Sequence, residues 1–308
     1  MGGWLRLVIA LRLALIVGLL WAPWALSAPI SLWRIQQGPS TLFLLGSIHV
    51  GKPNLYPLPA AMDQAFAAAD QLVLEIDLGL TSPRVMAEAL LSRGSYPAPE
   101  NLSANLSVDT LRLLTDYLQA RQTPPQQTDL SLPTVQRLRP WYLAMLLSLH
   151  ELTALGYVPG LGIDQHYYQQ ASLAGKTVYG LETLESQIAL LAAGSPRQQD
   201  LILRSALETN QEIDQMLATL TGAWKAGEID RMYTLAMADH ADYPELAGLM
   251  YEYLDQRNLQ MAAKLRTYLD GDQTTLAVVG ALHLGGQQGL LALLGKDYDI
   301  AQLQSSDP

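Results

Sequence analysis

Two octapeptides far apart in the chain decide how its fold is interpreted: Leu44–Gly51 reads LLGSIHVG, and Val278–Gly285 reads VVGALHLG. Both follow the pattern apolar, apolar, Gly, small, apolar, His, apolar, Gly, and each continues a strand-like apolar stretch. A single histidine after a strand is usually structural, but here two of the five histidines occupy matched settings. We therefore expect His49 and His283 to lie at the carboxyl ends of neighbouring strands and to share one site.

The segments around these octapeptides predict a sheet. LVLEI at Leu72–Ile76 is a short, nearly all-apolar run after a helical segment, which is typical of a strand covered on both faces. Strands that alternate with helices indicate an α/β fold with a mixed, largely parallel sheet. The predicted strands are Ser31–Gln36, Thr41–Leu45, Leu72–Ile76, Lys176–Tyr179, Thr274–Val279 and Tyr298–Leu303. We expect a turn at Gln37-Gly38-Pro39-Ser40 between the first two.

Helical patterns fill the rest of the chain and dominate its middle, so we expect a helical insertion or cap on the sheet. The predicted helices are Pro59–Ala69, Pro83–Leu91, Val108–Arg121, Trp141–Leu155, Asp164–Ala174, Thr183–Ala193, Pro196–Leu220, Ile229–Ala238, Tyr243–Leu269 and Gly289–Leu294. No linker divides these elements convincingly, and we predict one domain over residues 29–308.

The first 28 residues have the features of a secretory signal peptide. Arg6 and Arg12 precede or flank a short apolar run, LALIVGLLWAPWAL at Leu13–Leu26, which ends in the small residues Ser27 and Ala28. The alternative is an uncleaved membrane anchor, which the short run disfavours. We expect a periplasmic or secreted protein with no stable membrane insertion after processing.

Composition excludes several classes of protein. The chain of 308 residues has a net charge of −10, which argues against nucleic acid as a partner. It has no cysteine, which excludes disulfides, thiol nucleophiles and cysteine-ligated metals. Its sequence contains no Walker loop, no G-x-G-x-x-G, no G-x-S-x-G and no H-E-x-x-H. Nucleotide binding and serine hydrolase chemistry are therefore disfavoured.

Acidic residues follow the other predicted strands. Glu75 comes late in the apolar strand LVLEI, and Glu182 follows the strand KTVY. In parallel sheets ligands bind beyond the carboxyl ends of the strands, so His49, Glu75, Glu182 and His283 are expected to converge. Two imidazoles and two carboxylates suit a divalent metal, and they equally suit acid–base catalysis without one. The structural alternatives are a buried arginine partner for Glu75 and a helix cap for Glu182.

Three further residues are weaker candidates. Arg257 and Asn258 lie in a long helical region, where a partly buried arginine would hold an anionic intermediate or orient Glu75. A solvated or purely structural role explains this pair equally well. Asp164, in the segment PGLGIDQH, most simply caps the helix that follows it.

Taken together, these segments resemble the TraB/GumN family. The segments concerned are FLLGSIHVG, LYPLP, AFAAADQLVLEIDL, GIDQHYYQQASLAGKTVYGLETLESQ, Asp255-Gln256-Arg257-Asn258 and VVGALHLGGQQGLLALL. The family is similar to the Tiki metalloproteases and, more distantly, to erythromycin esterases and ChaN-type haem-binding proteins. The resemblance implies an α/β core and, by analogy with Tiki, peptide hydrolysis that depends on manganese or cobalt, with zinc as a further candidate.

The positions that match the motifs of the family, and that the resemblance therefore implies as its site, are Gly46 with His49, Glu75, Glu182, Arg257 with Asn258, and Gly280 with His283. One departure is Asp255-Gln256 before Arg257, where the family has an acidic residue immediately before the arginine.

Two functions from different classes follow. The first is a metal-dependent, peptidase-like hydrolase in which Glu75 or Glu182 moves protons, acting on a peptide or small molecule. The second is a non-catalytic envelope protein that binds a peptide, a metal or haem. The name of the family alone suggests a third role, in polysaccharide export.

Overall fold

A computed structural model of the chain describes residues 28–120, 131–209, 213–238 and 243–306. The predicted signal peptide, apart from Ala28, lies outside these residues. Within the described part of the chain, no helix combines the length and the apolar character that crossing a bilayer requires.

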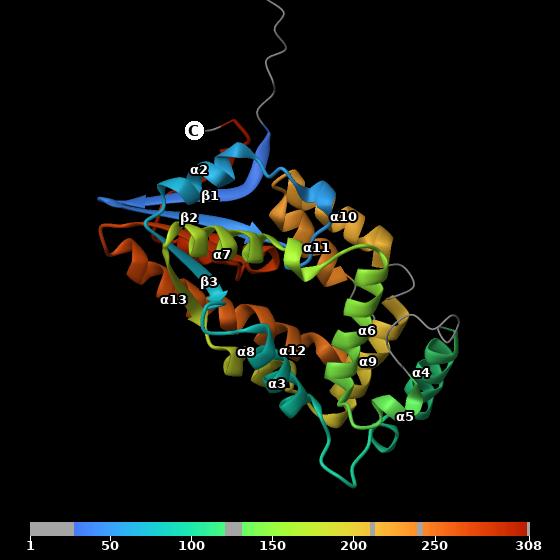
Figure 1. Cartoon of the computed structure of the whole chain (residues 1–308). Helices are drawn as coiled ribbons and strands as arrows, with labels where there is room; N and C mark the ends of the chain where they lie inside the picture. The colour runs from blue at the N-terminus through green and yellow to red at the C-terminus, as the bar shows by residue number, and fades with distance from the viewer. Residues whose placement is uncertain (1–27, 121–130, 210–212, 239–242, 307–308) are drawn as a thin grey trace, which may run out of the picture.

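Six strands form one mixed sheet at the upper end of the molecule (Figure 1). The strands are β1 Pro29–Gln37, β2 Ser40–Ser47, β3 Gln71–Ile76, β4 Thr177–Glu182, β5 Thr274–Gly280 and β6 Ile300–Gln304. Their order is β4-β3-β5-β2-β1-β6. The four strands from β4 to β2 are mutually parallel, whereas β1 pairs antiparallel with both β2 and β6. The predicted α/β class and the largely parallel sheet are confirmed.

The sequence explains this arrangement locally. Gly38 adopts a φ of 54°, which a glycine tolerates, and the turn there joins β1 to β2 as the predicted hairpin. Five of the six residues of β3 are buried, as expected for a strand with helices on both faces. Leu45 pairs with Val278 in the register of β2 and β5, so the two octapeptides lie side by side but displaced by one residue.

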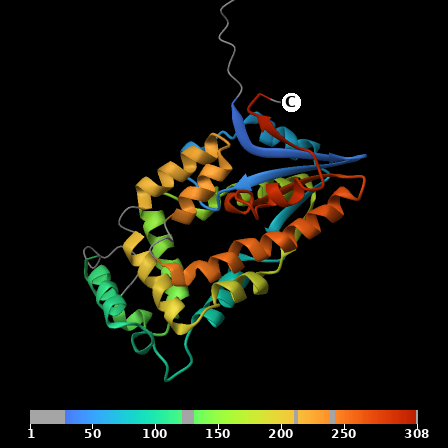
Figure 2. The same ribbon diagram turned by 180° about the vertical axis from the view of Figure 1, so that it is seen from behind.

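Helices cover both faces of the sheet. Helices α2 (Ala60–Ala68) and α7 (Ile163–Ala174) pack on the face seen in Figure 1. Helices α13 (Arg257–Leu269) and α14 (Leu290–Leu294) cover the opposite face, which Figure 2 brings to the front. The main core lies between these layers.

The predicted helical insertion is present and extends away from the carboxyl edge of the sheet (Figure 1). It has hydrophobic clusters of its own, one of which also includes Ile76 of β3. Its helices are α3 Pro83–Gly94, α4 Val108–Ala120, α5 Leu132–Val135, α6 Pro140–Ala154, α8 Leu184–Leu191, α9 Pro196–Thr209, α10 Ile213–Lys225, α11 Ile229–Ala238 and α12 Ala247–Met250. Of these, α10 also packs against β1. Buried side chains of helices α10 and α11, such as Trp224 and Ile229, belong to the core of the sheet.

Several predicted boundaries are wrong. The strand predicted at 176–179 runs on to Glu182, because its pairing with β3 continues to Ile76. The helix predicted over 196–220 corresponds to α9 and α10, with α10 running on to Lys225, and residues 210–212 between them lie outside the described part. The helix predicted over 243–269 is broken: a 3₁₀ turn at Pro244–Leu246 and α12 lead into a π-helical stretch, Tyr251–Gln256, directly before α13.

Candidate functional site

The carboxyl ends of four parallel strands bring the predicted residues together. Glu75 is the last but one residue of β3, Glu182 ends β4, and the two histidines follow the neighbouring strands β2 and β5. His49 Nε2 lies 3.7 Å from Glu75 Oε1, and His283 Nε2 lies 3.8 Å from the same oxygen. The expectation that the paired histidines share one location on neighbouring strands is confirmed.

Close packing explains why the first glycine of each octapeptide, Gly46 and Gly280, has no side chain. Gly280 N–H donates to Glu75 Oε1 over 2.7 Å. A Cβ on Gly280 would lie 3.0 Å from both Glu75 Oε1 and His49 Nε2, within the space that these atoms face. A Cβ on Gly46 would lie 3.0 Å from Leu284 Cδ1, so the first glycine lets the two octapeptides pack together.

His49 is held by a carboxylate from α7. Its Nδ1 lies 3.3 Å from Asp164 Oδ1, and the same oxygen accepts a hydrogen bond of 2.9 Å from the buried Ser47 hydroxyl. Asp164 N–H donates back to Ser47 Oγ. The loop before α7 is fixed against the first octapeptide, because Ile163 N–H donates to the Ile48 carbonyl. The prediction that Asp164 caps α7 is wrong: Gly162 occupies the cap position, and the Asp164 carboxylate supports His49 instead.

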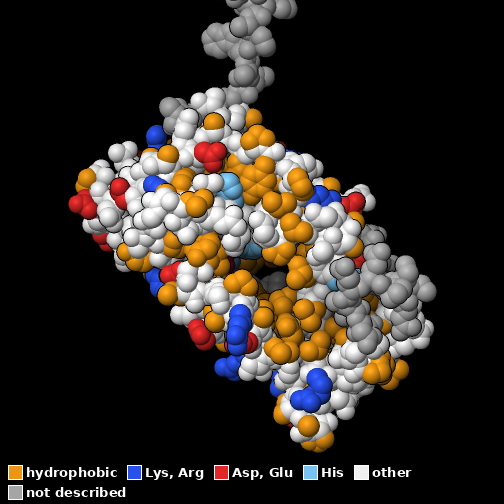
Figure 3. Space-filling view, in the orientation of Figure 1, with side chains coloured by type: hydrophobic (Ala, Val, Ile, Leu, Met, Phe, Trp, Pro, Cys, Tyr) orange, Lys and Arg blue, Asp and Glu red, His pale blue; other side chains and the backbone are white. Residues whose placement is uncertain are grey.

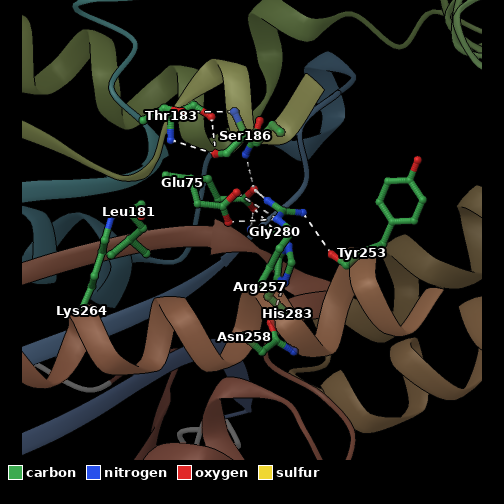
Figure 4. A network of polar contacts seen from close by, with 12 residues as sticks. Glu75, Leu181, Thr183, Ser186, Tyr253, Arg257, Asn258, Lys264, Gly280 and His283 are labelled. Carbon is green, nitrogen blue, oxygen red and sulfur yellow. Dashed lines mark hydrogen bonds and ion pairs between the residues drawn. The ribbon is translucent and has the colours of Figure 1, made fainter. Parts of the chain in front are cut away.

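His283 is held by a neutral side chain. Its Nδ1 lies 2.6 Å from Asn258 Oδ1 (Figure 4). Asn258 Nδ2 donates to the Gln288 carbonyl over 2.9 Å. This second bond fixes the amide so that its oxygen faces the ring, and we assign the ring proton to Nδ1 on that basis. His283 Nε2 therefore presents its lone pair toward Glu75. A metal-ligating histidine commonly has this arrangement, with its other nitrogen donating to an oxygen.

Arg257 joins the two carboxylates. Its Nε donates to both oxygens of Glu182 at 2.9 and 3.0 Å, and its Nη2 donates to Glu75 Oε2 at 2.6 Å (Figure 4). Its Nη1 donates to the Tyr253 carbonyl in the π-helical stretch. Of the roles weighed for Arg257, the geometry supports the orientation of Glu75. The cap alternative for Glu182 is wrong, because Thr183 caps α8.

Two contacts at the site have no signal in the sequence. Gln187 on α8 donates to Glu75 Oε2 over 3.0 Å, and no motif distinguishes it from other glutamines of the chain. Lys264 on α13 donates to the Leu181 carbonyl, next to Glu182. Both residues are brought in by helices that pack against the sheet edge, so only the tertiary structure reveals them.

The surroundings shift the pKa values of the two histidines in opposite directions. Burial lowers the pKa of His283 to about 4, so its ring is neutral at physiological pH. Solvent exclusion also opposes a charge on His49, but the hydrogen bond and charge of Asp164, with the charge of Glu75, outweigh it and raise the pKa to about 9. Water reaches 58% of the His49 side chain and partly screens these charges.

The pKa values of the two carboxylates, Glu75 and Glu182, are also shifted in opposite directions. Burial opposes ionisation of Glu75, yet both histidines, Arg257 and the Gly280 N–H favour the anion and lower its pKa to about 2. Burial raises the pKa of Glu182 despite its pair with Arg257. Glu75 is therefore a fixed anion at neutral pH, and Glu182 is the more easily protonated of the two.

Glu75 Oε1, His49 Nε2 and His283 Nε2 are oxygen and nitrogen atoms of the kind that a divalent cation takes as ligands. Two ligands about 2.1 Å from a metal and at a tetrahedral angle lie about 3.4 Å apart. The separations of 3.7 and 3.8 Å from Glu75 Oε1 to the two Nε2 atoms exceed this by a few tenths of an ångström. As they stand, no three histidine or acidic side chains of the described residues enclose a metal position. Glu182, the fourth predicted ligand, has both oxygens engaged by Arg257.

The face shown in Figure 3 is hollowed between the sheet edge and the helical insertion. Hydrophobic side chains, coloured orange, form much of the wall of this hollow, and histidine side chains appear near it (Figure 3). A concave, largely apolar surface beside a few polar groups is the usual setting of a ligand site.

Comparison with known proteins identifies the family to which the chain belongs. Its sequence is 34% identical over 148 residues to "Uncharacterized protein YbaP" of Escherichia coli (strain K12), and equally to the protein of that name from Shigella flexneri. These matches cover 48% of this chain and 50% of each relative, so the chain spans about half the length of the curated relatives it matches. No solved structure matches. The sequence model of the TraB/PrgY/gumN family matches residues 31–301, and the chain belongs to that family.

Proposed function

We propose that this chain is a divalent-metal-dependent hydrolase with a peptide-like substrate. The observation that carries the proposal is the convergence of His49 Nε2 and His283 Nε2 on Glu75 Oε1 at the carboxyl edge of the sheet. Manganese, cobalt and zinc are the candidate cations. A bound cation of this kind polarises a carbonyl and lowers the pKa of water, which is the chemistry such a site supplies.

The residues of the chain have distinct roles in this proposal. His49, His283 and Glu75 hold the cation, with Glu75 kept anionic by Arg257 and by the Gly280 N–H. Arg257 and Asn258 act as positioning residues, because they contact Glu75 and His283 rather than the space that these ligands face. Glu182 is the better candidate for moving a proton, because its pKa is raised whereas that of Glu75 is lowered.

We place this activity in the periplasm or outside the cell. The cationic start and the short apolar run within residues 1–28 support export. N-terminal sequencing of the mature protein tests this, and a chain that begins near Ala28 or Pro29 is expected. Recovery of intact Met1 in a membrane pellet would contradict it.

Peptide cleavage tests the hydrolase itself. Protein stripped with a chelator and then dialysed is mixed with a peptide library in the presence of Mn²⁺, Co²⁺ or Zn²⁺, and products are identified by mass spectrometry. We expect cleavage only with added cation, and its loss in His283→Ala. His150→Ala, on α6 in the helical insertion, is the matched control and should cleave as the wild type does.

A non-catalytic binding protein is the second candidate. The observation in its favour is that Arg257 engages oxygens of both Glu75 and Glu182, which leaves neither carboxylate fully available for proton transfer. This function predicts that one cation binds per chain and that no peptide of the library is cleaved under any metal condition. Cleavage that requires the cation and His283 would exclude it.

A further inference from the structure

A second concave site lies in the helical insertion, apart from the sheet edge. It is a half-open cavity of about 600 Å³ between the end of α3, the segment after it, the start of α6 and the end of α8. Its lining is Ser92, Arg93, Ser95, Tyr96, Pro97, Arg139 and Ala192. None of these residues belongs to the site at the strand ends, so neither the family nor the proposed hydrolase accounts for the cavity.

The walls of this cavity are rigidly joined. Ser95 and Leu138 form an antiparallel bridge, and Arg139 N–H donates to the Gly94 carbonyl over 2.7 Å. Gly94 packs so closely on Tyr142 that a Cβ would lie 2.4 Å from its ring. The backbone at both arginine-bearing segments is therefore fixed before any ligand arrives, which lowers the entropic cost of binding.

Two arginines in the cavity lack an acidic partner. Within the described part of the chain, Arg84, Arg197, Arg204, Arg231, Arg257 and Arg266 form ion pairs with carboxylates. No such pair is formed there by Arg93 or Arg139. Arg34, Arg112 and Arg137 likewise form no ion pair among the described residues, but only Arg93 and Arg139 line this cavity together.

Aromatic packing orients one of these arginines. The Arg139 guanidinium carbon lies 4.6 Å from the centre of the Tyr96 ring, and Arg139 is only partly exposed. Stacking of this kind fixes the plane of the guanidinium group and leaves its N–H donors free for a ligand. Burial raises the pKa of Tyr96; the Arg139 charge opposes this shift and the Glu100 charge adds to it. Glu100 forms no ion pair with either arginine.

Hydroxyl groups complete the donor set. Ser92 lies in the last turn of α3 and Ser95 directly follows the helix, and both serines line the cavity together with Arg93. Planar guanidinium groups with neighbouring hydroxyls match the oxygens of a phosphate or a carboxylate. We propose that this cavity binds an oxyanion, a phosphate or carboxylate group, through Arg93 and Arg139.

Titration calorimetry with inorganic phosphate tests the proposal directly. The full chain, stripped of metal so that the sheet-edge site offers no cation for phosphate, should bind one phosphate with a Kd on the order of millimolar or tighter. Arg139→Gln and Arg93→Gln should each weaken binding by about tenfold or more, because each removes a charge-assisted contact. Succinate in place of phosphate determines whether the site also accepts carboxylates.

Three controls separate this site from general charge effects and from misfolding. Arg84→Gln removes an equal charge from the same helix, but at an exposed arginine paired with Glu88, and should bind as the wild type does. His283→Ala should also bind normally, since it alters only the sheet edge. Arg139→Lys keeps the charge but loses the planar fork and should bind at an intermediate level.

The outcomes are distinct. Loss of phosphate binding in the two arginine variants, with retention in Arg84→Gln and His283→Ala, supports the site. Absence of binding by the wild type, equal binding by all the variants, or loss in Arg84→Gln to the same degree would overturn it. Circular dichroism spectra that match the wild type exclude misfolding of a variant as the cause of lost binding.

Discussion

Replacing Arg257 with methionine removes the cation that Glu75 and Glu182 share. The Arg257 side chain is 14% exposed, and those of Glu75 and Glu182 are 11% and 6% exposed. Methionine fills a similar volume but donates no hydrogen bond, so the variant keeps two largely buried carboxylates without their partner. Breaking a buried ion pair from one side typically costs about 3–5 kcal/mol of the free energy of unfolding, and we expect a loss of that order.

The pH dependence identifies the cause of the loss. An unpaired buried carboxylate has a pKa raised above its unfolded value, so it contributes stability when protonated and loses it as the pH rises through the raised pKa. The deficit of Arg257→Met relative to the wild type should therefore shrink from about pH 8 to about pH 5. Wild-type Glu75, with a pKa of about 2, stays ionised across this window and contributes no such change.

Urea unfolding at both pH values, followed by circular dichroism, measures the two free energies. The matched control is Arg266→Met, on the same helix: Arg266 pairs with Asp297 at 2.6 Å, but the two side chains are 32% and 50% exposed. That variant should lose no more than about 1 kcal/mol. An Arg257→Met deficit equal to that of Arg266→Met, or one that grows at acid pH, would refute the reasoning.

The remaining predictions concern the cation. Gly280→Ala places a Cβ 3.0 Å from both Glu75 Oε1 and His49 Nε2, so Mn²⁺ affinity by calorimetry should fall by about tenfold or more. Gly222→Ala, whose Cβ would meet nothing within 4 Å, should leave it unchanged. Mn²⁺ binding should tighten between about pH 6 and pH 9, because His49, with a pKa of about 9, must lose a proton before Nε2 binds a cation; a flat profile would contradict this. Asp164→Asn should move the midpoint of that profile toward lower pH, and an unmoved midpoint would exclude Asp164 as the cause of the shift.

Much of the sheet could be predicted because its signals are local. The apolar run of β3 and the Gly-Pro turn after β1 each report a structure formed by adjacent residues. The matched octapeptides added long-range information, since two similar strand ends are best explained by one site. That inference led to the correct neighbours, β2 and β5, although the register displaces the two copies by one residue.

The contacts that set the chemistry could not be predicted in the same way. Asp164 contacts His49 directly and is itself held by Ser47, a residue 117 positions away, and nothing in the local sequence of Asp164 separates this role from a helix cap. Arg257 is placed by the π-helical stretch before it, whereas the local pattern predicts one continuous helix. The failure at Asp164 occurs where a tertiary contact takes precedence over local preference.

X-ray absorption spectroscopy of the zinc-loaded protein tests the central claim most directly. If His49, His283 and Glu75 share one cation, stripped wild-type protein reloaded with Zn²⁺ should retain one ion per chain, with two imidazole nitrogens and a carboxylate oxygen among its ligands. His49→Ala and His283→Ala should each lose one imidazole or release the metal. Failure of the wild type to retain zinc, or a bound ion with no imidazole ligand, would contradict the account.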